Sequence, residues 1–274
     1  MITRTRTALA AFGVALFAIS ACGTAGESAS VETATDPTST VGLASFDGGC
    51  AGSVVAVDGA RPSDAALFLT NGHCDTDRAV YGRANVDQPG QASAVISTGS
   101  ATPGVAAQVD RRLYWTMTGT DVALFRLQRT YGDLADRGIK PFRLSDRRPE
   151  TGERITVATP TKPYRCTVAR TVPTVMEMGL QTNDVLAYSP ECDTVAGTSG
   201  APVLDEKAQI IGINNSHNTS GGQCTRNEPC EVSREGVVTV SRGTGYAPPV
   251  RGLVSCLTGT RLDLGKVGCS LPKP

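Results

Sequence analysis

Residues 69–74 read Leu-Thr-Asn-Gly-His-Cys, a run that places a histidine at the end of an apolar stretch and directly before a cysteine. Further along, residues 120–125 read Thr-Asp-Val-Ala-Leu-Phe and residues 197–203 read Gly-Thr-Ser-Gly-Ala-Pro-Val. The three motifs supply a base, an acid and a hydroxyl in the order His, Asp, Ser, which is one of several orders used by serine triads. They predict a nucleophilic site assembled from distant parts of the chain.

Around these motifs the chain consists of short apolar runs separated by Gly, Pro, Asp and Asn, which is typical of strands and turns. The 274 residues include 30 glycines and 16 prolines, and aromatic residues make up only 5%. This composition favours an all-β sandwich or barrels over a helical fold. The expected strands are 41–46, 51–57, 65–70, 94–97, 122–127, 154–158, 167–172, 185–188, 201–204, 209–214 and 237–240, with a short helix at 249–257.

The first 21 residues have the pattern of a signal peptide, with a basic start, an apolar run too short to span a bilayer, and small residues at the end. They finish Ile-Ser-Ala before Cys22, which resembles a bacterial lipobox, in which the cysteine is acylated. Ordinary secretion with Cys22 uninvolved is the alternative. We expect residues 1–21 to be a lipoprotein signal peptide and Cys22 to carry lipid. Residues 22–40 are small and polar and should form a flexible tether.

The cysteine count also indicates export. Nine cysteines are present, and removal of Cys22 from the set leaves eight, an even number. An even set in an exported chain predicts disulfides. Zinc is the alternative, but it usually requires close Cys-x-x-Cys or Cys/His pairs, and we expect neither a metal nor a cofactor. The eight cysteines are Cys50, Cys74, Cys166, Cys192, Cys224, Cys230, Cys256 and Cys269.

The three motifs resemble the His, Asp and Ser motifs of the chymotrypsin-like (trypsin-like) serine peptidases, and the resemblance covers about residues 41–250. It implies two six-stranded antiparallel β-barrels with the active site between them. Barrel one would span about 41–128 and barrel two about 144–250. A disulfide-stapled extension at 251–274, with a short C-terminal helix or tail, would follow.

The resemblance also implies a role for each motif residue. Ser199 would be the nucleophile and His73 the base that takes its proton. Asp121 would hold the imidazole in the right tautomer. The backbone N–H groups of Gly197 and Ser199 would form the oxyanion hole. The chain would thus be a serine endopeptidase that forms an acyl-enzyme intermediate.

Around the serine, the sequence is closer to a bacterial branch that includes the glutamyl endopeptidases. Those enzymes place a histidine directly after a Gly-Ile pair, whereas here Gly212-Ile213 is followed by Asn214. Asp193 lies where trypsin-like enzymes carry the aspartate that binds Arg or Lys. The same spacing occurs in the glutamyl branch without basic specificity, which favours a turn residue whose carboxylate bonds nearby backbone. His217 could edge the pocket or lie exposed on a loop. The candidate pocket residues are Asp193, Thr194, Asn215, Ser216 and His217.

Cysteine pairing follows from the same resemblance and from proximity. In the family, cysteines placed like Cys50 and Cys74 form a disulfide that fixes the histidine loop. Two cysteines six residues apart in a polar loop should pair with each other, and two others should staple the C-terminal tail. The expected bridges are Cys50–Cys74, Cys166–Cys192, Cys224–Cys230 and Cys256–Cys269.

Charge gives no sign of a polyanionic partner, because 26 basic and 26 acidic side chains cancel and no long run of one sign occurs. We expect a monomer that acts on a protein or peptide substrate and binds no nucleic acid. It should lie outside the cytoplasm, either attached to a bacterial membrane only through its N-terminal lipid or secreted. A catalytically silent, surface-anchored binding protein on the same fold is one alternative. An esterase that uses the same acyl-enzyme chemistry is another.

Overall fold

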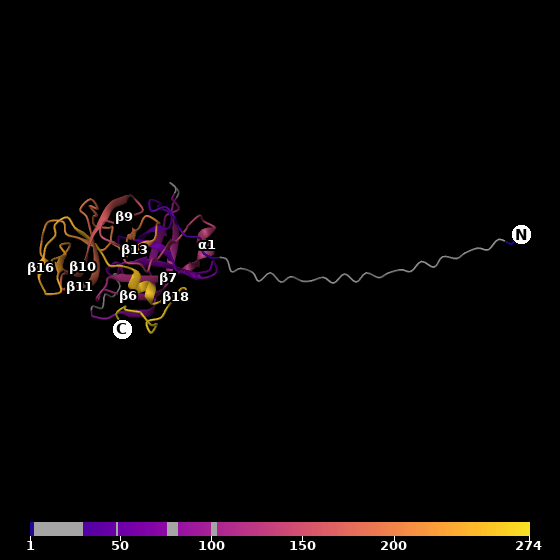
Figure 1. Cartoon of the computed structure of the whole chain (residues 1–274). Coiled ribbons are helices and arrows are strands. Elements are labelled where there is room, and N and C mark those ends of the chain that lie inside the picture. The colour runs from indigo at the N-terminus through magenta and orange to yellow at the C-terminus, as the bar shows by residue number, and fades with distance from the viewer. Residues whose placement is uncertain (3–29, 48, 76–81, 100–102) are drawn as a thin grey trace.

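A computed structural model describes residues 1–2, 30–47, 49–75, 82–99 and 103–274 (Figure 1). The expected signal peptide and the lipidation site Cys22 fall largely in the stretch 3–29, outside the described residues. Within the described ranges, no helix has the length and apolar character needed to cross a membrane.

The first sheet closes on itself. Its order is β1-β5-β6-β7-β3-β2, and β1 pairs with β2 to complete a ring of six antiparallel strands. Two further strands, β4 and β8, attach to β6 and β2. The strands of this sheet are β1 Leu43–Phe46, β2 Cys50–Ala56, β3 Ala65–Thr70, β4 Asn85–Pro89, β5 Ser93–Ile96, β6 Val105–Thr116, β7 Val122–Thr130 and β8 Phe142–Arg143.

The second sheet has nine strands in the order β13-β12-β9-β10-β11-β17-β14, with β15 and β16 added beside β10. The sheet closes because the segment after β17 runs beside β13, where Gly212 forms a bridge with Pro249 and the Ile213 N–H donates to Pro248 O at 3.1 Å. The strands are β9 Arg154–Ala158, β10 Pro163–Glu177, β11 Leu180–Tyr188, β12 Pro202–Leu204, β13 Ile210–Ile213, β14 Ser216–His217, β15 Cys230–Val232, β16 Val238–Thr239 and β17 Gly245–Ala247.

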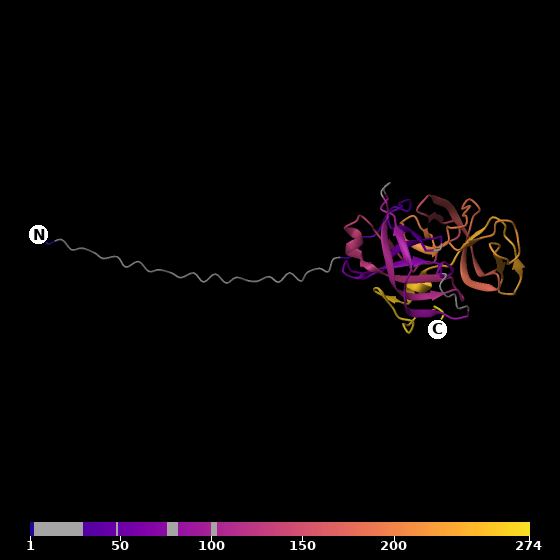
Figure 2. The same cartoon turned by 180° about the vertical axis from the view of Figure 1, so that it is seen from behind.

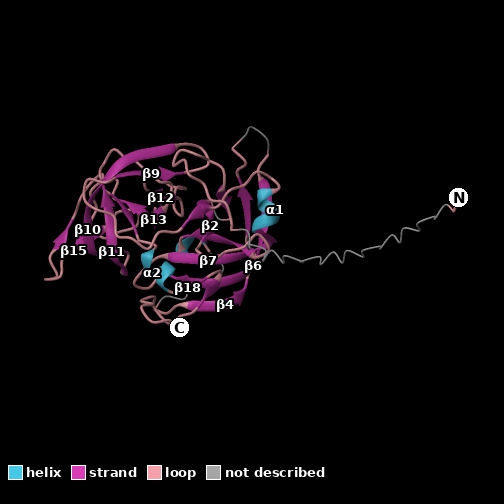
Figure 3. Ribbon diagram, turned by 45° about the vertical axis from the view of Figure 1, so that its right-hand side comes forward, coloured by secondary structure: helices cyan, strands magenta, loops and turns pink. Residues whose placement is uncertain are grey.

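The prediction of an all-β, two-barrel fold of the chymotrypsin-like type is therefore confirmed, with nine strands rather than six in the second sheet. Figures 1 and 2 show the two sheets side by side, with β6 and β7 in one and β9, β10 and β11 in the other. Helices are few and short (Figure 3). They are the 3₁₀ turn η1 Gly72–Cys74, α1 Tyr131–Ala135 and α2 Arg251–Ser255, the last inside the range expected for a C-terminal helix.

Each barrel has its own apolar interior. In the first, Phe46 stacks on Phe68 and on Phe125, with ring centroids 5.4 Å apart in both pairs. In the second, Tyr188 is fully buried among Val, Leu and Ile side chains. Burial of side chains of this size contributes about 1.5–3 kcal/mol each. A third cluster joins residues of both sheets to the C-terminal extension, so the two barrels share one packed interface.

The C-terminal extension packs on the first barrel. Two short strands, β18 Leu257–Thr258 and β19 Arg261–Leu262, pair after α2. Leu271 is 7% exposed in the shared cluster, and the Tyr114 hydroxyl donates to Pro272 O at 2.9 Å. Burial raises the pKa of Tyr114, so this hydroxyl stays a donor.

Residues 30–40, expected as part of the flexible tether, lie instead against the first barrel. Ala34 is 8% exposed, and its N–H donates to Pro141 O at 2.9 Å. Val31 packs on the apolar interior, and Glu32 forms an ion pair with Lys140. This stretch is held on the barrel by the apolar side chains of Val31 and Ala34, together with the Pro141 carbonyl and the Lys140 ammonium beside them.

Several strands of the structure were not predicted from the sequence, because they carry charged residues or are very short. β6 is the longest strand of the first sheet, but it contains Asp110, Arg111 and Arg112 and so lacks a regular apolar alternation. The sheet satisfies these charges by ion pairs with Arg126, Asp87 and Asp75 respectively. β4, β8, β14, β15, β17, β18 and β19 were also missed.

Candidate active site

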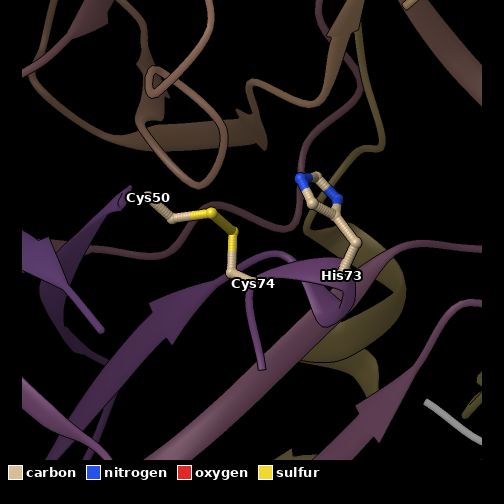
Figure 4. A group of neighbouring side chains, drawn as sticks. All are labelled: Cys50, His73 and Cys74. Atoms are coloured by element: carbon tan, nitrogen blue, oxygen red, sulfur yellow. A yellow bond between two sulfur atoms is a disulfide. The ribbon is translucent and has the colours of Figure 1, made fainter. Parts of the chain in front are cut away.

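His73 lies in η1, the 3₁₀ turn that follows β3. A disulfide between Cys74 in this turn and Cys50 at the start of β2 fixes it to the barrel, with a Cα–Cα distance of 5.9 Å (Figure 4). Gly72 is required by close packing, because a Cβ there would lie 2.1 Å from Thr116 O. The turn therefore presents the imidazole in one place.

Asp121 begins the turn into β7 and holds His73 by two bonds. Its Oδ2 lies 2.8 Å from His73 Nδ1, and its Oδ1 accepts the His73 backbone N–H at 3.0 Å. Asp121 is 6% exposed. Burial alone lowers the pKa of the His73 imidazole, but the charge and hydrogen bond of Asp121, with the charge of Glu177, outweigh burial and raise this pKa above 6.5. The pair is arranged to stabilise an imidazolium.

Asn71, two residues before the histidine, joins the three motifs. Its Nδ2 donates to Asp121 O at 3.0 Å, and its Oδ1 accepts the Gly200 N–H at 2.6 Å. The side chain is fully buried. The amide thus fixes the Asp strand and the Ser loop to the His turn. The residue stands in the first quoted motif, but its role was not predicted, because both partners are distant in sequence.

Ser199 lies between β11 and β12, in a loop whose glycines are demanded by geometry. Gly197 and Gly200 have φ of 88° and 85°, where side chains are disfavoured. A Cβ on Gly200 would lie 2.1 Å from both Ala51 O and Thr70 Oγ1. The Ser199 carbonyl accepts the Ala51 N–H at 2.7 Å. The loop therefore sits directly on the first barrel.

The Ser199 hydroxyl donates to Asn215 O at 3.1 Å. This hydroxyl forms no hydrogen bond with His73 in the structure, since its proton is directed at the Asn215 carbonyl. Serine side chains change rotamer within picoseconds to nanoseconds. Catalytic hydrogen bonds are commonly loose before substrate binds. The structure thus brings His73 and Asp121 into contact and places Ser199 on the same barrel seam with its hydroxyl directed elsewhere.

The loop before Ser199 is shaped by neutral contacts. Asn214 Nδ2 donates to Thr198 O at 2.9 Å and to Thr198 Oγ1 at 3.0 Å, and Thr198 Oγ1 donates to Val195 O at 2.6 Å. The Asn214 Oδ1 in turn accepts the Tyr188 hydroxyl. Within the described part of the chain, the N–H groups of Gly197 and Ser199 donate to no acceptor. Both amides are available to an anionic oxygen.

The candidate pocket residues divide into two groups. Thr194 is buried, and its hydroxyl contacts the buried Tyr188 hydroxyl. Asp193 is exposed, and its carboxylate bonds none of the described residues, so the bonds expected of a turn aspartate are not formed.

The other three candidates line the edge of the second sheet. Asn215 offers its carbonyl to Ser199, and Ser216 and His217 form β14 beside β17. His217 is half-buried on a strand rather than exposed on a loop, and its Nε2 is buried with no described partner.

The cysteines pair in the expected way: Cys50–Cys74, Cys166–Cys192, Cys224–Cys230 and Cys256–Cys269. Among the described residues, one cluster has metal-ligand geometry, with the donor atoms of Cys50, His73 and Cys74 within 4.8 Å of one another. Its two sulfurs are bonded to each other (Figure 4). They are not the thiolates that a metal requires, so this cluster does not fit one.

Two β-barrels that meet at a His–Asp pair and a glycine-flanked serine define the class of trypsin-like hydrolytic folds. A family comparison agrees, because the model of the trypsin-like peptidase domain matches residues 50–213. The chain belongs to this family.

Similar solved structures include the MamO protease domain from Magnetospirillum magneticum, apo form, at 17% identity and TM-score 0.48, covering 81% of this chain and 98% of that one. Rv3671c protease from M. tuberculosis, active form, is 14% identical with TM-score 0.47, covering 88% and 85%. The chymotrypsin of Cellulomonas bogoriensis is 16% identical with TM-score 0.42, covering 80% and 94%. No curated protein matches the chain.

The His73–Asp121 pair makes a prediction for NMR titration. Because the chain has two histidines, the histidine ring signals of a His217→Asn variant come from His73 alone. The pH at the midpoint of their titration, which is the pKa of His73, should lie above 6.5. Asp121→Asn should lower it by about 1 unit or more, since the opposing charge is lost and burial remains. A midpoint below 6.5 in the parent, or no change with Asp121→Asn, would contradict the arrangement.

Asn71→Ala should lower the free energy of unfolding by about 1–3 kcal/mol, because Asp121 O loses its buried donor and Gly200 N–H loses one acceptor. The folded variant should also lose most of its reactivity at Ser199. Leu134→Ala is the control: a buried residue of α1 remote from the site, it should cost about 2–5 kcal/mol and leave reactivity intact. Equal reactivity in the two variants would show that Asn71 is structural only.

Proposed function

We propose that the protein is an extracytoplasmic serine endopeptidase that cleaves peptide bonds through Ser199, His73 and Asp121. The observation that carries the proposal is the bidentate hold of Asp121 on His73, at Nδ1 and at the backbone N–H. It leaves Nε2 of the ring free to face a nucleophile. Membership of a peptidase family supports the same reaction.

The reaction begins when the Ser199 hydroxyl turns from Asn215 O toward His73. Oγ attacks the substrate carbonyl carbon while Nε2 takes its proton, and Asp121 stabilises the imidazolium that results. The new oxyanion is held by the N–H groups of Gly197 and Ser199, each worth about 2.7–4 kcal/mol. His73 then protonates the leaving amine.

Water completes the cycle. It attacks the acyl-enzyme carbonyl, and His73 accepts its proton and returns one to Ser199 Oγ as the acid product leaves. Each step uses only side chains and backbone groups of this chain, so the proposed mechanism requires no cofactor. We infer a monomer, because the described residues of one chain supply every group.

A fluorophosphonate probe tests the enzyme against a catalytically silent scaffold. The parent protein should be labelled at Ser199, identified by peptide mass, and should cleave peptides. Ser199→Ala should abolish labelling, and His73→Ala should slow peptide cleavage by roughly 10⁴- to 10⁶-fold. Ser189→Ala is the matched control, because that hydroxyl bonds Thr167 and Glu191 and none of the three proposed catalytic residues. A parent protein that neither labels nor cleaves would support the binding-protein alternative.

The membrane attachment is a separate proposal that rests on the sequence around Cys22 and on the disulfides, which suit an oxidising compartment. Two or more lipid chains on Cys22 would anchor the protein stably. Cys22→Ser should move the protein from the membrane fraction into the medium or block its processing, as followed by immunoblot. A parent protein already in the soluble fraction with Cys22 intact would refute the anchor.

A further inference from the structure

A second carboxylate lies beside the proposed catalytic pair. Glu177 ends β10, and its charge acts on both His73 and Asp121. Chain geometry brings it there: β10 and β11 form a hairpin, and Gly119, two residues before Asp121, bonds Gln181 O and Asn183 N–H of that hairpin. Glu177 is therefore held at the site by contacts independent of its own charge.

A rigid loop orients the Glu177 carboxylate. The Asn227 N–H donates to its Oε1 at 2.6 Å. Asn227 lies between Cys224 and Cys230, which are disulfide-bonded, and Cys230 pairs with Met176 of β10. The Glu228 carboxylate braces the loop from inside by accepting the N–H groups of residues 220, 221 and 222. Such a fixed carboxylate is suited to recognition.

The charge on Glu177 has no permanent partner. Among the described residues no Lys or Arg forms an ion pair with it, and the side chain is half-buried. Burial raises the pKa of its carboxyl above 4.5. His73 supplies a counter-charge only while its imidazole is protonated, and a general base is neutral before it takes a proton. A partly buried, uncompensated carboxylate is costly unless a cation meets it when the site is occupied.

The position of Glu177 indicates what that cation belongs to. The Ser216 side chain opposes the rise in the pKa of the Glu177 carboxyl, and Ser216 lies next to Asn215, whose carbonyl bonds Ser199. β14 pairs only with β17 in the described sheet, so its other edge can accept an extended peptide. Residues on the amino side of the scissile bond would follow that edge, past the carboxylate.

We propose that Glu177 is a specificity-determining residue that binds a Lys or Arg side chain of the substrate, within the few residues on the amino side of the residue whose carbonyl is attacked. The proposal rests on the endopeptidase function proposed above. It differs from the trypsin-like pocket considered at Asp193, because the carboxylate comes from the end of β10 and flanks His73.

Peptides that carry Lys or norleucine at the second, third or fourth residue before the cleaved bond test the proposal on the full chain. At one of these positions, kcat/KM should favour Lys by about tenfold, a free-energy difference of roughly 1.4 kcal/mol. The preference should shrink at high salt. Glu177→Gln should abolish the preference for Lys. Glu177→Lys should reverse it, so that a peptide with Glu at that position is cleaved faster than the Lys peptide. Glu235→Gln, which changes an exposed carboxylate in the turn between β15 and β16, should leave the preference unchanged.

The outcomes separate the two proposals. If the parent protein labels and cleaves but treats Lys and norleucine alike, Glu177 has no role in specificity while the enzyme stands. If Glu177→Gln lowers kcat/KM equally for the Lys and norleucine peptides, the carboxylate serves His73 instead and the proposal fails. Fluorophosphonate labelling of each variant shows that it is folded. A parent protein that neither labels nor cleaves removes the proposed function itself.

Discussion

The side-chain amide of Asn71 is the contact on which the site depends. It is fully buried at the seam between the barrels and satisfies two backbone groups from segments 50 and 129 residues away. Without this amide, Asp121 O would be left unpaired in the interior at a cost of about 1–3 kcal/mol, and the Gly200 N–H would keep only Asn214 O as its acceptor. An amide has one acceptor and donors on the same planar group, so only one relative placement of the Asp strand and the Ser loop satisfies both. The distance between acid, base and nucleophile is thereby fixed before substrate arrives.

The loop before Ser199 follows the same logic with neutral groups. Asn214 bonds Thr198 at two atoms, and Tyr188 bonds Asn214 from beneath. A loop shaped by a buried charge would need a counter-charge delivered from elsewhere in the chain. Here every partner is uncharged and already present, so the proposed oxyanion hole does not depend on how the N-terminus is cut.

Sequence patterns identified what is local and missed what is long-range. The His, Asp and Ser motifs are contiguous runs, and the apolar strands around them were recognisable for that reason. β6 was missed because its charged side chains are neutralised by ion pairs that no local pattern shows, such as Asp110 with Arg126. The role of Asn71 and the proximity of Glu177 to His73 depend on pairings of strands far apart in the chain. The rotamer of Ser199 depends on one competing carbonyl.

The small Cys224–Cys230 loop shows why such long-range features matter for function. A bridge that spans six residues stabilises the fold by about 2 kcal/mol in the chain-entropy model, less than a bridge that closes a longer loop. It also has a structural consequence, because the loop carries the Asn227 N–H that fixes Glu177. Its position beside β10 and the His73 turn makes sense if the loop serves to hold a carboxylate where a substrate side chain passes.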